Sequence, residues 1–186
     1  MAAVPSNMLA LGTPAPDFVL PDTVSGKTLS LTDLKSDVAT VIMFICNHCP
    51  YVKHVNKELA KLARDYQVRG VAFVAISSND IAAYPADSPE QMRLVAAEQG
   101  YTFPYLYDED QSVAKAYQAA CTPDFYIFDA GMKLVYRGQL DDARPRNDVP
   151  VTGKDVRAAL EAILAGEAVA AEQRPSIGCN IKWKEA

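Results

Sequence analysis

The sequence has no long apolar run and no basic patch. No stretch approaches the ~20 apolar residues of a membrane-spanning helix. Residues 1–7 have neither the positive charge nor the apolar segment of a secretory signal. The net charge of −5 argues against nucleic acid or an anionic membrane surface as the main partner. We therefore expect a cytoplasmic protein with no nucleic-acid partner and no membrane partner.

Cysteine is scarce, with 4 in 186 residues. In a reducing compartment this number does not indicate a disulfide framework, which leaves catalytic thiols, a metal site or unreactive buried side chains. Hydrophobic residues make up 49% of the chain and charged residues 22%, as in a globular protein. The length predicts one domain, residues 1–166, with a C-terminal tail, residues 167–186, that packs on it.

Two of the cysteines, Cys46 and Cys49, stand between an apolar run and an amphipathic helix. Residues 38–45 are almost all apolar, which is typical of a strand buried on both faces of a sheet. The dithiol is thus predicted at a strand-to-helix turn, where free N–H groups and the helix dipole stabilise a thiolate at Cys46. After the dithiol, apolar residues recur at helical spacing, namely Val52, Val55, Leu59, Leu62 and Tyr66.

The order of the other elements predicts an α/β fold with a mixed sheet. Right-handed crossovers would make the strands at 38–45 and 71–76 parallel and place Cys46 at the carboxyl edge of the sheet. Ser88 is the expected N-cap of a helix that ends at Gly100. The remaining expected elements are a hairpin at 22–30, a helical turn at 31–34, a strand at 104–107, a helix at 111–119, strands at 125–128 and 133–137, and a final helix opened by Thr152 and Asp155.

Over roughly residues 12–165 the chain resembles thioredoxin-fold proteins of the redoxin group, which includes the AhpC/TSA peroxiredoxins. It is most similar to a peroxiredoxin-like "thioredoxin family protein" subgroup that carries a Cys-x-x-Cys motif. The resemblance implies a thioredoxin fold, with a central mixed β-sheet flanked by helices, an N-terminal β-hairpin extension and a C-terminal tail. It is carried by Pro16-Asp17-Phe18-Val19-Leu20, Gly26-Lys27-Thr28-Leu29-Ser30-Leu31, Cys46-Asn47-His48-Cys49, Thr122-Pro123 and the ending Cys179-Asn180-Ile181-Lys182-Trp183-Lys184.

The resemblance also implies roles for individual residues. Pro123 would be a cis-proline that faces the dithiol, with the Thr122 backbone pairing with an extended substrate segment. We expect Cys46 to be the more exposed nucleophile with a lowered pKa, and Cys49 to resolve the mixed disulfide. His48, between them, would tune the redox potential by stabilising the reduced form. The predicted function is that of a thiol-disulfide oxidoreductase, an enzyme that uses the Cys46/Cys49 pair.

An alternative within enzymes is a thiol peroxidase with an antioxidant function. Peroxiredoxins usually carry a Thr and a Pro before the reactive cysteine and an Arg after the Thr-Pro pair. The corresponding positions here are Met43, Ala39 and Asp124, so the groups that orient and polarise the O–O bond are missing. Disulfide exchange is therefore favoured over peroxide chemistry.

The alternative from another class is a soft-metal binding protein. Cys46, Cys49, Cys179 and His48 offer the thiolate and imidazole ligands that suit Zn or Cu(I). The oxidoreductase hypothesis needs no metal and no cofactor. Thioredoxin has a buried Asp six residues before its first cysteine, and Thr40 stands there in this chain, so the group that deprotonates Cys49 stays open.

The other cysteines have less defined expectations as accessory thiols. Cys121 adjoins Thr122 but should point away from it and be buried. For Cys179, packing and a redox or ligand role stay open; a tail folded over the cleft would give Cys46 a second resolving partner. Residues 139–152 are either a solvated charged loop or a wall of the cleft. Expected partners are a protein or low-molecular-weight disulfide and a thiol reductant such as thioredoxin or glutathione, and the chain would be a monomer or homodimer.

Overall fold

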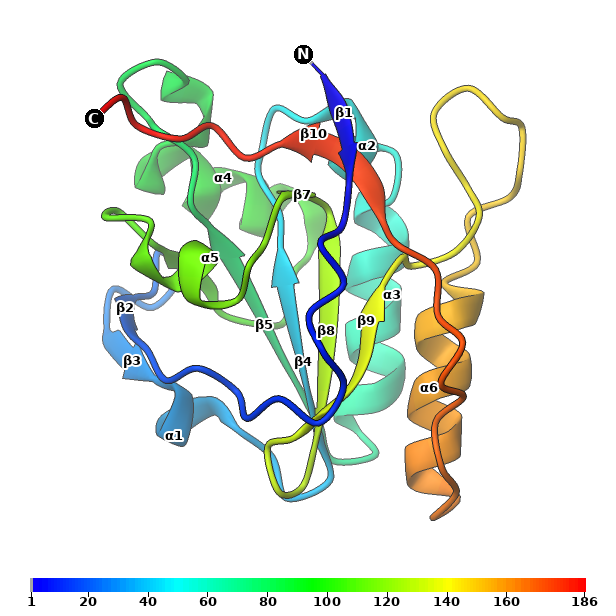
Figure 1. Cartoon of the computed structure of the whole chain (residues 1–186). Helices are drawn as coiled ribbons and strands as arrows, with labels where there is room; N and C mark the ends of the chain where they lie inside the picture. Colours follow the sequence, from blue (N-terminus) through cyan, green and yellow to red (C-terminus); the bar gives the residue numbers. More distant parts are fainter. Residues whose placement is uncertain (1) are drawn as a thin grey trace.

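The computed structural model describes residues 2–186, and a central mixed sheet runs through its middle (Figure 1). The two pairs at one side of the sheet are parallel and the two at the other side are antiparallel, as expected from the α/β order. The strand order is β6 (Tyr105–Tyr107), β5 (Val71–Ser77), β4 (Ala39–Phe44), β8 (Asp124–Asp129) and β9 (Leu134–Gly138).

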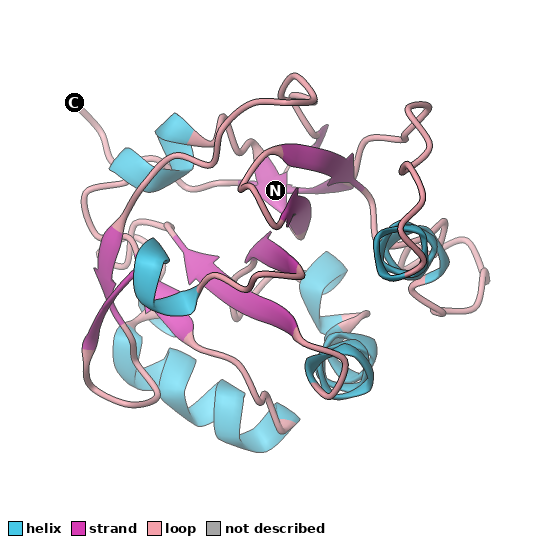
Figure 2. Cartoon of the chain, turned by 90° about the horizontal axis from the view of Figure 1, so that it is seen from below, coloured by secondary structure: helices cyan, strands magenta, loops and turns pink. Residues whose placement is uncertain are grey.

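Helices cover both faces of this sheet (Figure 2), and the central strand β4 is therefore buried on both sides. Val41 and Met43 lie in one hydrophobic cluster, and the alternate residues Ile42 and Phe44 lie in another. The helices are α3 (Asn56–Gln67), α4 (Pro89–Gln99) and α6 (Lys154–Leu164) over the first cluster, and α1 (Leu31–Leu34) and α5 (Ser112–Ala116) over the second. The thioredoxin fold predicted from the sequence is confirmed.

The segment expected to be one continuous helix after the dithiol is divided. The short helix α2 (Pro50–Lys53) ends before α3 begins at Asn56. The expected apolar stripe is nevertheless buried, from Val52 to Tyr66. Cys49 is the N-cap of α2, so Cys46 lies outside the helix and is not at its first residue as expected. Cys49, and not Cys46, is therefore the cysteine at the N-terminus of a helix.

Two other elements begin at different residues from those expected. The hairpin consists of β2 (Val19–Pro21) and β3 (Thr28–Ser30), so it starts before Asp22. Helix α6 has Gly153 as its N-cap and no side-chain cap, so the predicted opening by Thr152 is wrong. The backbone N–H groups of Thr152 and Gly153 both donate to the carboxylate of Asp141 instead, which satisfies them from a different part of the chain.

The two ends of the chain meet in a second, small sheet that the sequence did not predict. Its order is β1 (Ala3–Pro5), β10 (Ile177–Asn180) and β7 (Cys121–Thr122), with both pairs antiparallel. In Figure 1 the blue β1 and the red β10 cross the top of the molecule, above the upper ends of β4 and β5. The C-terminal tail thus supplies the middle strand, while the division of the chain at residue 166 stays a prediction.

The helices can also be compared with the length and hydrophobicity of a membrane span. None of the helices within residues 2–186 has the length and hydrophobicity that crossing a bilayer requires.

Gly178 is the point of closest approach in the small sheet. A Cβ at this residue would overlap the carbonyl oxygen of Thr122 in the paired strand β7. We predict that Gly178→Ala lowers the free energy of unfolding by about 1–3 kcal/mol, the usual cost of an added methyl group without space. Urea unfolding of the reduced protein measures this change.

Gly131→Ala is the matched control for this substitution. Gly131 lies in the turn between β8 and β9, where a Cβ would come no closer than 3.4 Å to the Asp129 carboxylate oxygen. We expect little change in its unfolding free energy. Equal stability of the two variants would contradict the close packing of β10 on β7.

Candidate active site

The dithiol lies at the carboxyl end of β4 and is closed to solvent. Cys46 follows the strand by two residues, and Cys49 precedes α2 directly. The exposed fractions of the two residues are only 2% and 0%. The expectation that Cys46 is the more exposed thiol is therefore not met in this conformation, because the small sheet covers both sulfur atoms.

The Thr122–Pro123 segment faces the dithiol. The peptide bond between the two residues is cis, as the resemblance implied. The Sγ atom of Cys46 lies 3.5 Å from the Thr122 hydroxyl, and the Sγ atom of Cys49 lies 3.4 Å from the Thr122 carbonyl oxygen, which can accept the thiol hydrogen. One residue therefore contacts both sulfur atoms.

Strand β10 occupies the edge at which a substrate segment was expected to pair. Cys179 lies directly opposite Thr122 in the antiparallel register. Its Sγ atom lies 2.7 Å from the Sγ atom of Cys49. The tail does fold over the cleft, but the sulfur that it brings to the dithiol contacts Cys49 and not Cys46. Cys179 is the accessory thiol that the structure brings into the site.

A buried carboxylate, Asp87, organises the residues between the two cysteines. Its Oδ1 atom accepts hydrogen bonds from the backbone N–H groups of Asn47 (2.8 Å) and His48 (3.2 Å). Its Oδ2 atom lies 2.5 Å from His48 Nδ1 and accepts a bond from Asn79 Nδ2 at 2.9 Å. Asp87 has no exposed surface. These contacts fix both the Cys-x-x-Cys backbone and the imidazole ring.

Asp87 was not among the residues predicted for the site. It lies in the short 3₁₀ helix η1 (Pro85–Asp87), in a stretch that looked like a polar loop. One signal could have found it: the chain leaving β5 starts at the same edge of the sheet as the chain leaving β4, since these strands are parallel. Polar residues soon after β5 were therefore candidates for contact with the dithiol.

The His48 ring is held on both sides. It stacks on Tyr84, with ring centroids 5.1 Å apart and an interplanar angle of 14°. Its Nε2 atom is buried and has no hydrogen-bond partner within residues 2–186. Ligand-type atoms of Cys46, His48 and Asp87 all lie within 4.8 Å of one another. This set, a thiol, an imidazole and a carboxylate, differs from the predicted metal ligands, since it contains Asp87, which was not predicted, and lacks Cys49 and Cys179, which were.

The thiol pKa values have the reverse of the expected order. The hydrogen bond with Cys49, burial and the negative charge of Asp87 raise the pKa of Cys46 well above its usual value. The same hydrogen bond lowers the pKa of Cys49 to about 5 against the effect of burial, with further contributions from Cys179 and Thr122. The resting thiolate is therefore on Cys49, because the hydrogen bond between the two thiols, burial and the charge of Asp87 all disfavour a negative charge on Cys46.

Cys121 is a buried thiol outside this cluster. Its Sγ atom lies 3.8 Å from the carbonyl oxygen of Pro123, and its exposed fraction is 0%. Burial raises the pKa of this thiol far above its usual value. Cys121 therefore has the environment of a packing residue.

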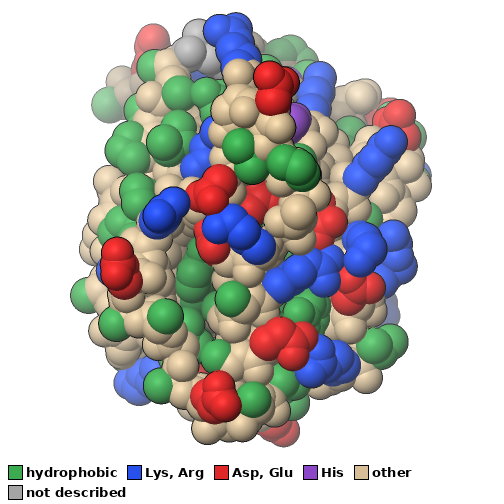
Figure 3. Space-filling model, turned by 90° about the vertical axis from the view of Figure 1, so that its right-hand side faces the viewer, with side chains coloured by type: hydrophobic (Ala, Val, Ile, Leu, Met, Phe, Trp, Pro, Cys, Tyr) green, Lys and Arg blue, Asp and Glu red, His purple; other side chains and the backbone are tan. Residues whose placement is uncertain are grey.

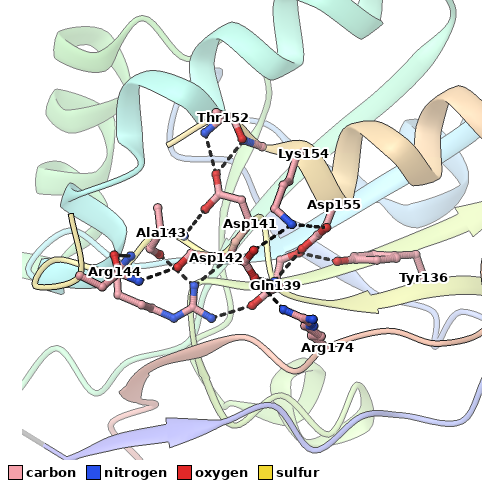
Figure 4. A network of polar contacts seen from close by, with 12 residues as sticks. Tyr136, Gln139, Asp141, Asp142, Ala143, Arg144, Thr152, Lys154, Asp155 and Arg174 are labelled. Carbon is pink, nitrogen blue, oxygen red and sulfur yellow. Dashed lines mark hydrogen bonds and ion pairs between the residues drawn. The ribbon is translucent and has the colours of Figure 1, made fainter. Parts of the chain in front are cut away.

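Residues 139–152 form an ordered loop and not a freely solvated one (Figure 4). Asp141 accepts backbone hydrogen bonds from Thr152 and Gly153 at 2.8 and 2.7 Å. The Arg144 guanidinium donates to the Asp141 backbone oxygen at 2.8 Å and to Gln139 Oε1 at 2.7 Å. Figure 3 shows that positive and negative side chains are mixed over the side of the molecule that carries α6.

This loop forms one wall of a pocket beside the dithiol. The pocket has a volume of about 290 Å³ and contains Cys179 in its lining. Tyr51 and Pro50 of α2 form one side, while Arg144 and Arg146 of the loop form another. Each of the two interpretations of residues 139–152 holds for part of the loop: residues 144–146 line the pocket, and residues 145–150 are exposed.

The comparisons with known proteins agree with the fold. A family model described as "AhpC/TSA family" matches residues 11–137. An uncharacterized conserved protein from Geobacillus kaustophilus is 64% identical, with a TM-score of 0.99 over 100% of this chain and 98% of its own. A hypothetical protein from Sinorhizobium meliloti 1021 is 51% identical, with a TM-score of 0.95 over 98% of this chain and 99% of its own.

More distant structures share the fold alone. The thioredoxin domain of a thiol-disulfide oxidoreductase from Bacteroides vulgatus is 20% identical, with a TM-score of 0.61 over 72% of this chain and 91% of its own. The search among curated proteins found no match.

The inverted thiol order makes a pH-dependent prediction. Because its pKa is lowered, the Cys49 thiol of the reduced protein should lose its proton as the pH rises through about 5, and regain it below that pH. Thiolate absorbance in the ultraviolet should therefore show one step there. Cys49→Ser should remove the step, whereas Cys46→Ser should keep it, because serine still donates a hydrogen bond to Cys49.

Cys121→Ser serves as the control in this titration and should leave the step unchanged. Loss of the step in Cys46→Ser, with its retention in Cys49→Ser, would restore the order expected from the sequence.

Proposed function

The chain belongs to the AhpC/TSA family, and from this membership and the geometry of its dithiol we propose that it is a thiol-disulfide oxidoreductase. The single observation that carries the proposal is that Cys46 and Cys49 both contact Thr122, next to the cis-proline Pro123. Two thiols that both contact Thr122, on the strand with which an extended substrate would pair, are suited to a sulfur-to-sulfur transfer.

The proposed cycle begins with attack by Cys46 on a substrate disulfide. As the Cys46 sulfur bonds to one substrate sulfur, the other leaves as a thiolate and takes up a proton. Cys49 then attacks the Cys46 sulfur, which forms the Cys46–Cys49 disulfide and releases the second substrate thiol. Two electrons pass from the dithiol to the substrate.

The resting protonation state defines what the first step requires. The proton of the hydrogen bond between the two thiols belongs to Cys46, so this proton must move before Cys46 attacks. Cys49, which accepts that bond, and the paired His48 and Asp87, within 4.8 Å of Cys46, are the groups able to take it. Asp87 therefore lies where it can act on Cys46, whereas the thioredoxin acid that Thr40 replaces serves the second cysteine.

The substrate would be a protein or low-molecular-weight disulfide, and a thiol such as thioredoxin or glutathione would return the electrons. We further propose that the protein works in the cytoplasm, as a monomer or homodimer. The acidic net charge of −5 supports neither nucleic acid nor an anionic membrane as a partner.

Family membership supports a second candidate, a thiol peroxidase. Against it, Asp124 stands where peroxiredoxins place an arginine, and its carboxylate is buried and accepts a hydrogen bond from Ser6 at 2.8 Å. A buried acid at this point offers no positive charge for a peroxide. Disulfide exchange is therefore the preferred proposal.

Two rate constants, one for reduction of a disulfide and one for reaction with hydrogen peroxide, distinguish the two candidate functions. We expect the prereduced protein to reduce a model protein disulfide rapidly and to react with hydrogen peroxide no faster than an ordinary thiol. Cys46→Ser and Cys49→Ser should each lower the disulfide rate by a factor on the order of 100 or more, because nucleophile and resolving thiol act as a unit. Cys121→Ser should stay within about twofold, as expected of a thiol used only for packing.

Peroxide reacting orders of magnitude faster than the disulfide, with a sulfenic acid on Cys46, would replace this proposal by the peroxidase. Metal analysis of protein purified without chelator tests the remaining alternative, a metal-binding protein. A stoichiometric metal that disappears in Asp87→Asn and Cys46→Ser would support a metal site at Cys46, His48 and Asp87.

The charges next to Cys46 predict shifts of the reduction potential in opposite directions. His48→Ala removes the imidazole that lies 2.5 Å from the Asp87 carboxylate, so this carboxylate disfavours the thiolate form more strongly and the potential should fall. Asp87→Asn removes the negative charge, so the potential should rise. Each shift should be on the order of 30 mV, about 1.4 kcal/mol, in a glutathione redox titration.

His54→Ala is the matched control, since His54 is exposed at the end of α2. It should leave the potential unchanged. An unchanged potential in both His48→Ala and Asp87→Asn would remove these two residues from the tuning of the dithiol.

A further inference from the structure

We propose that Cys179 is a third redox thiol, which exchanges with the dithiol through a Cys49–Cys179 disulfide. The proposal rests on the thiol-disulfide function proposed above and assigns the cysteine of the tail a step in it. It starts from the position of β10, which has the same place on β7 that an extended substrate would have, with its own cysteine directed at the dithiol.

The two sulfur atoms are already close to bonding distance. They lie 2.7 Å apart. A disulfide is about 2.05 Å long, so bond formation needs a shift of less than about 1 Å. Both residues are in well-held backbone: Cys49 caps α2, and Cys179 is paired on both edges of β10, with Ala3 and with Thr122.

The chain after Cys179 is also fixed. The Ile181 N–H donates to the Ala120 carbonyl at 3.0 Å, and the Lys182 N–H donates to Asn79 Oδ1 at 2.9 Å. Asn79 in turn donates to Asp87. The tail is therefore connected through Asn79 to Asp87, the carboxylate that positions His48. Cys179 thus belongs to the same hydrogen-bonded site as the dithiol.

The acidities of the two thiols suit the opening of the Cys49–Cys179 disulfide. Cys49 has a lowered pKa and is the better leaving group, whereas burial and the hydrogen bond with Cys49 raise the pKa of Cys179 to about 12. In a disulfide between unequal thiols, an attacking thiol displaces the sulfur of lower pKa more readily. Attack on Cys179 with release of Cys49 is thus the favoured direction of opening.

Access favours the same direction. Cys179 contributes to the lining of the pocket of about 290 Å³ between α2 and the loop with Arg144 and Arg146, whereas neither Cys46 nor Cys49 does. A small external thiol that enters this pocket lies next to Cys179, whose exposed fraction is 4%. The guanidinium groups at its wall also favour a thiol that carries carboxylates, such as glutathione.

The exchange balances in two steps. After substrate reduction, the Cys179 thiolate attacks Cys49 in the Cys46–Cys49 disulfide; the Cys49–Cys179 bond forms, and Cys46 leaves as a thiolate that takes the proton given up by Cys179. No net oxidation occurs. One external thiol then attacks Cys179 and releases Cys49, and a second external thiol cleaves the resulting mixed disulfide, restoring Cys179 and yielding the oxidised external pair.

Trypsin gives a direct test because the two possible disulfides lie in different peptides. Cys46 and Cys49 share the peptide 36–53, Cys121 lies in 116–133, and Cys179 lies in 158–182. The reduced protein is treated with one equivalent of a substrate disulfide, free thiols are alkylated in acid, and the digest is analysed by mass spectrometry. We expect peptide 36–53 joined to peptide 158–182.

Single substitutions identify the partner within peptide 36–53. The joined peptide should persist in Cys46→Ser oxidised with diamide and disappear in Cys49→Ser and Cys179→Ser. Cys121→Ser is the control and should retain it. A joined peptide that depends on Cys46 and not on Cys49 would overturn the assignment of Cys49 as the partner.

Kinetics separates this inference from the function on which it rests. Cys179→Ser should still reduce one equivalent of a protein disulfide, but its turnover with glutathione should fall at least tenfold. Unchanged turnover, with a disulfide confined to peptide 36–53, would overturn the role of Cys179 and leave the oxidoreductase in place. If the unsubstituted protein reduces no disulfide at all, the proposed function fails and this inference fails with it.

Discussion

The antiparallel pairing of β10 with β7 is the contact on which the geometry of the site depends. It places Cys179 against Cys49 and closes the dithiol to solvent. Strand β1 pairs with the other edge of β10, so residues from the beginning of the chain hold its end in place. A strand with both edges paired has no free edge to offer another chain. A protein substrate can therefore use the Thr122 edge only after the tail has moved, whereas a small thiol can enter beside it.

Two buried carboxylates set the charge distribution around this contact. Asp87 lies within hydrogen-bond distance of four nitrogen atoms, and its negative charge adds to the hydrogen bond with Cys49 and to burial in raising the pKa of Cys46. Asp124 follows Pro123, and burial raises its pKa to about 7. Its hydrogen bond from Ser6, which also accepts from the Ser176 N–H, ties both ends of the chain to the cis-proline segment. Asp87 thus holds the segment between the two cysteines, and Asp124 holds the two chain ends beside it.

Patterns of apolar residues in the sequence predicted correctly which segments are buried in the core. The unbroken apolar run of β4 and the stripe from Val52 to Tyr66 required burial, and both are in the core. The break between α2 and α3 was not visible, because an apolar stripe is the same in one helix or two. Strand β10 was also missed: its four residues, Ile-Gly-Cys-Asn, have too short an alternation to indicate a strand, and their partners come from distant parts of the chain. The reversed acidities of the two thiols were not visible either, because they depend on the contacts of Cys46 with Asp87 and of Cys49 with Cys179, which join distant parts of the chain.

The placement of the thiolate bears on the choice between the two redox chemistries. Fast peroxide reduction needs an accessible thiolate together with donors that polarise the O–O bond. Here the accessible route leads to Cys179, whose pKa is raised, while the acidic sulfur of Cys49 is enclosed between Cys179 and Thr122. An enclosed, acidic sulfur is poorly placed as a first nucleophile but well placed as a leaving group, because its thiolate is stabilised at the moment of release. For the proposed oxidoreductase, this arrangement therefore favours transfer between sulfur atoms within the protein over direct reduction of a peroxide.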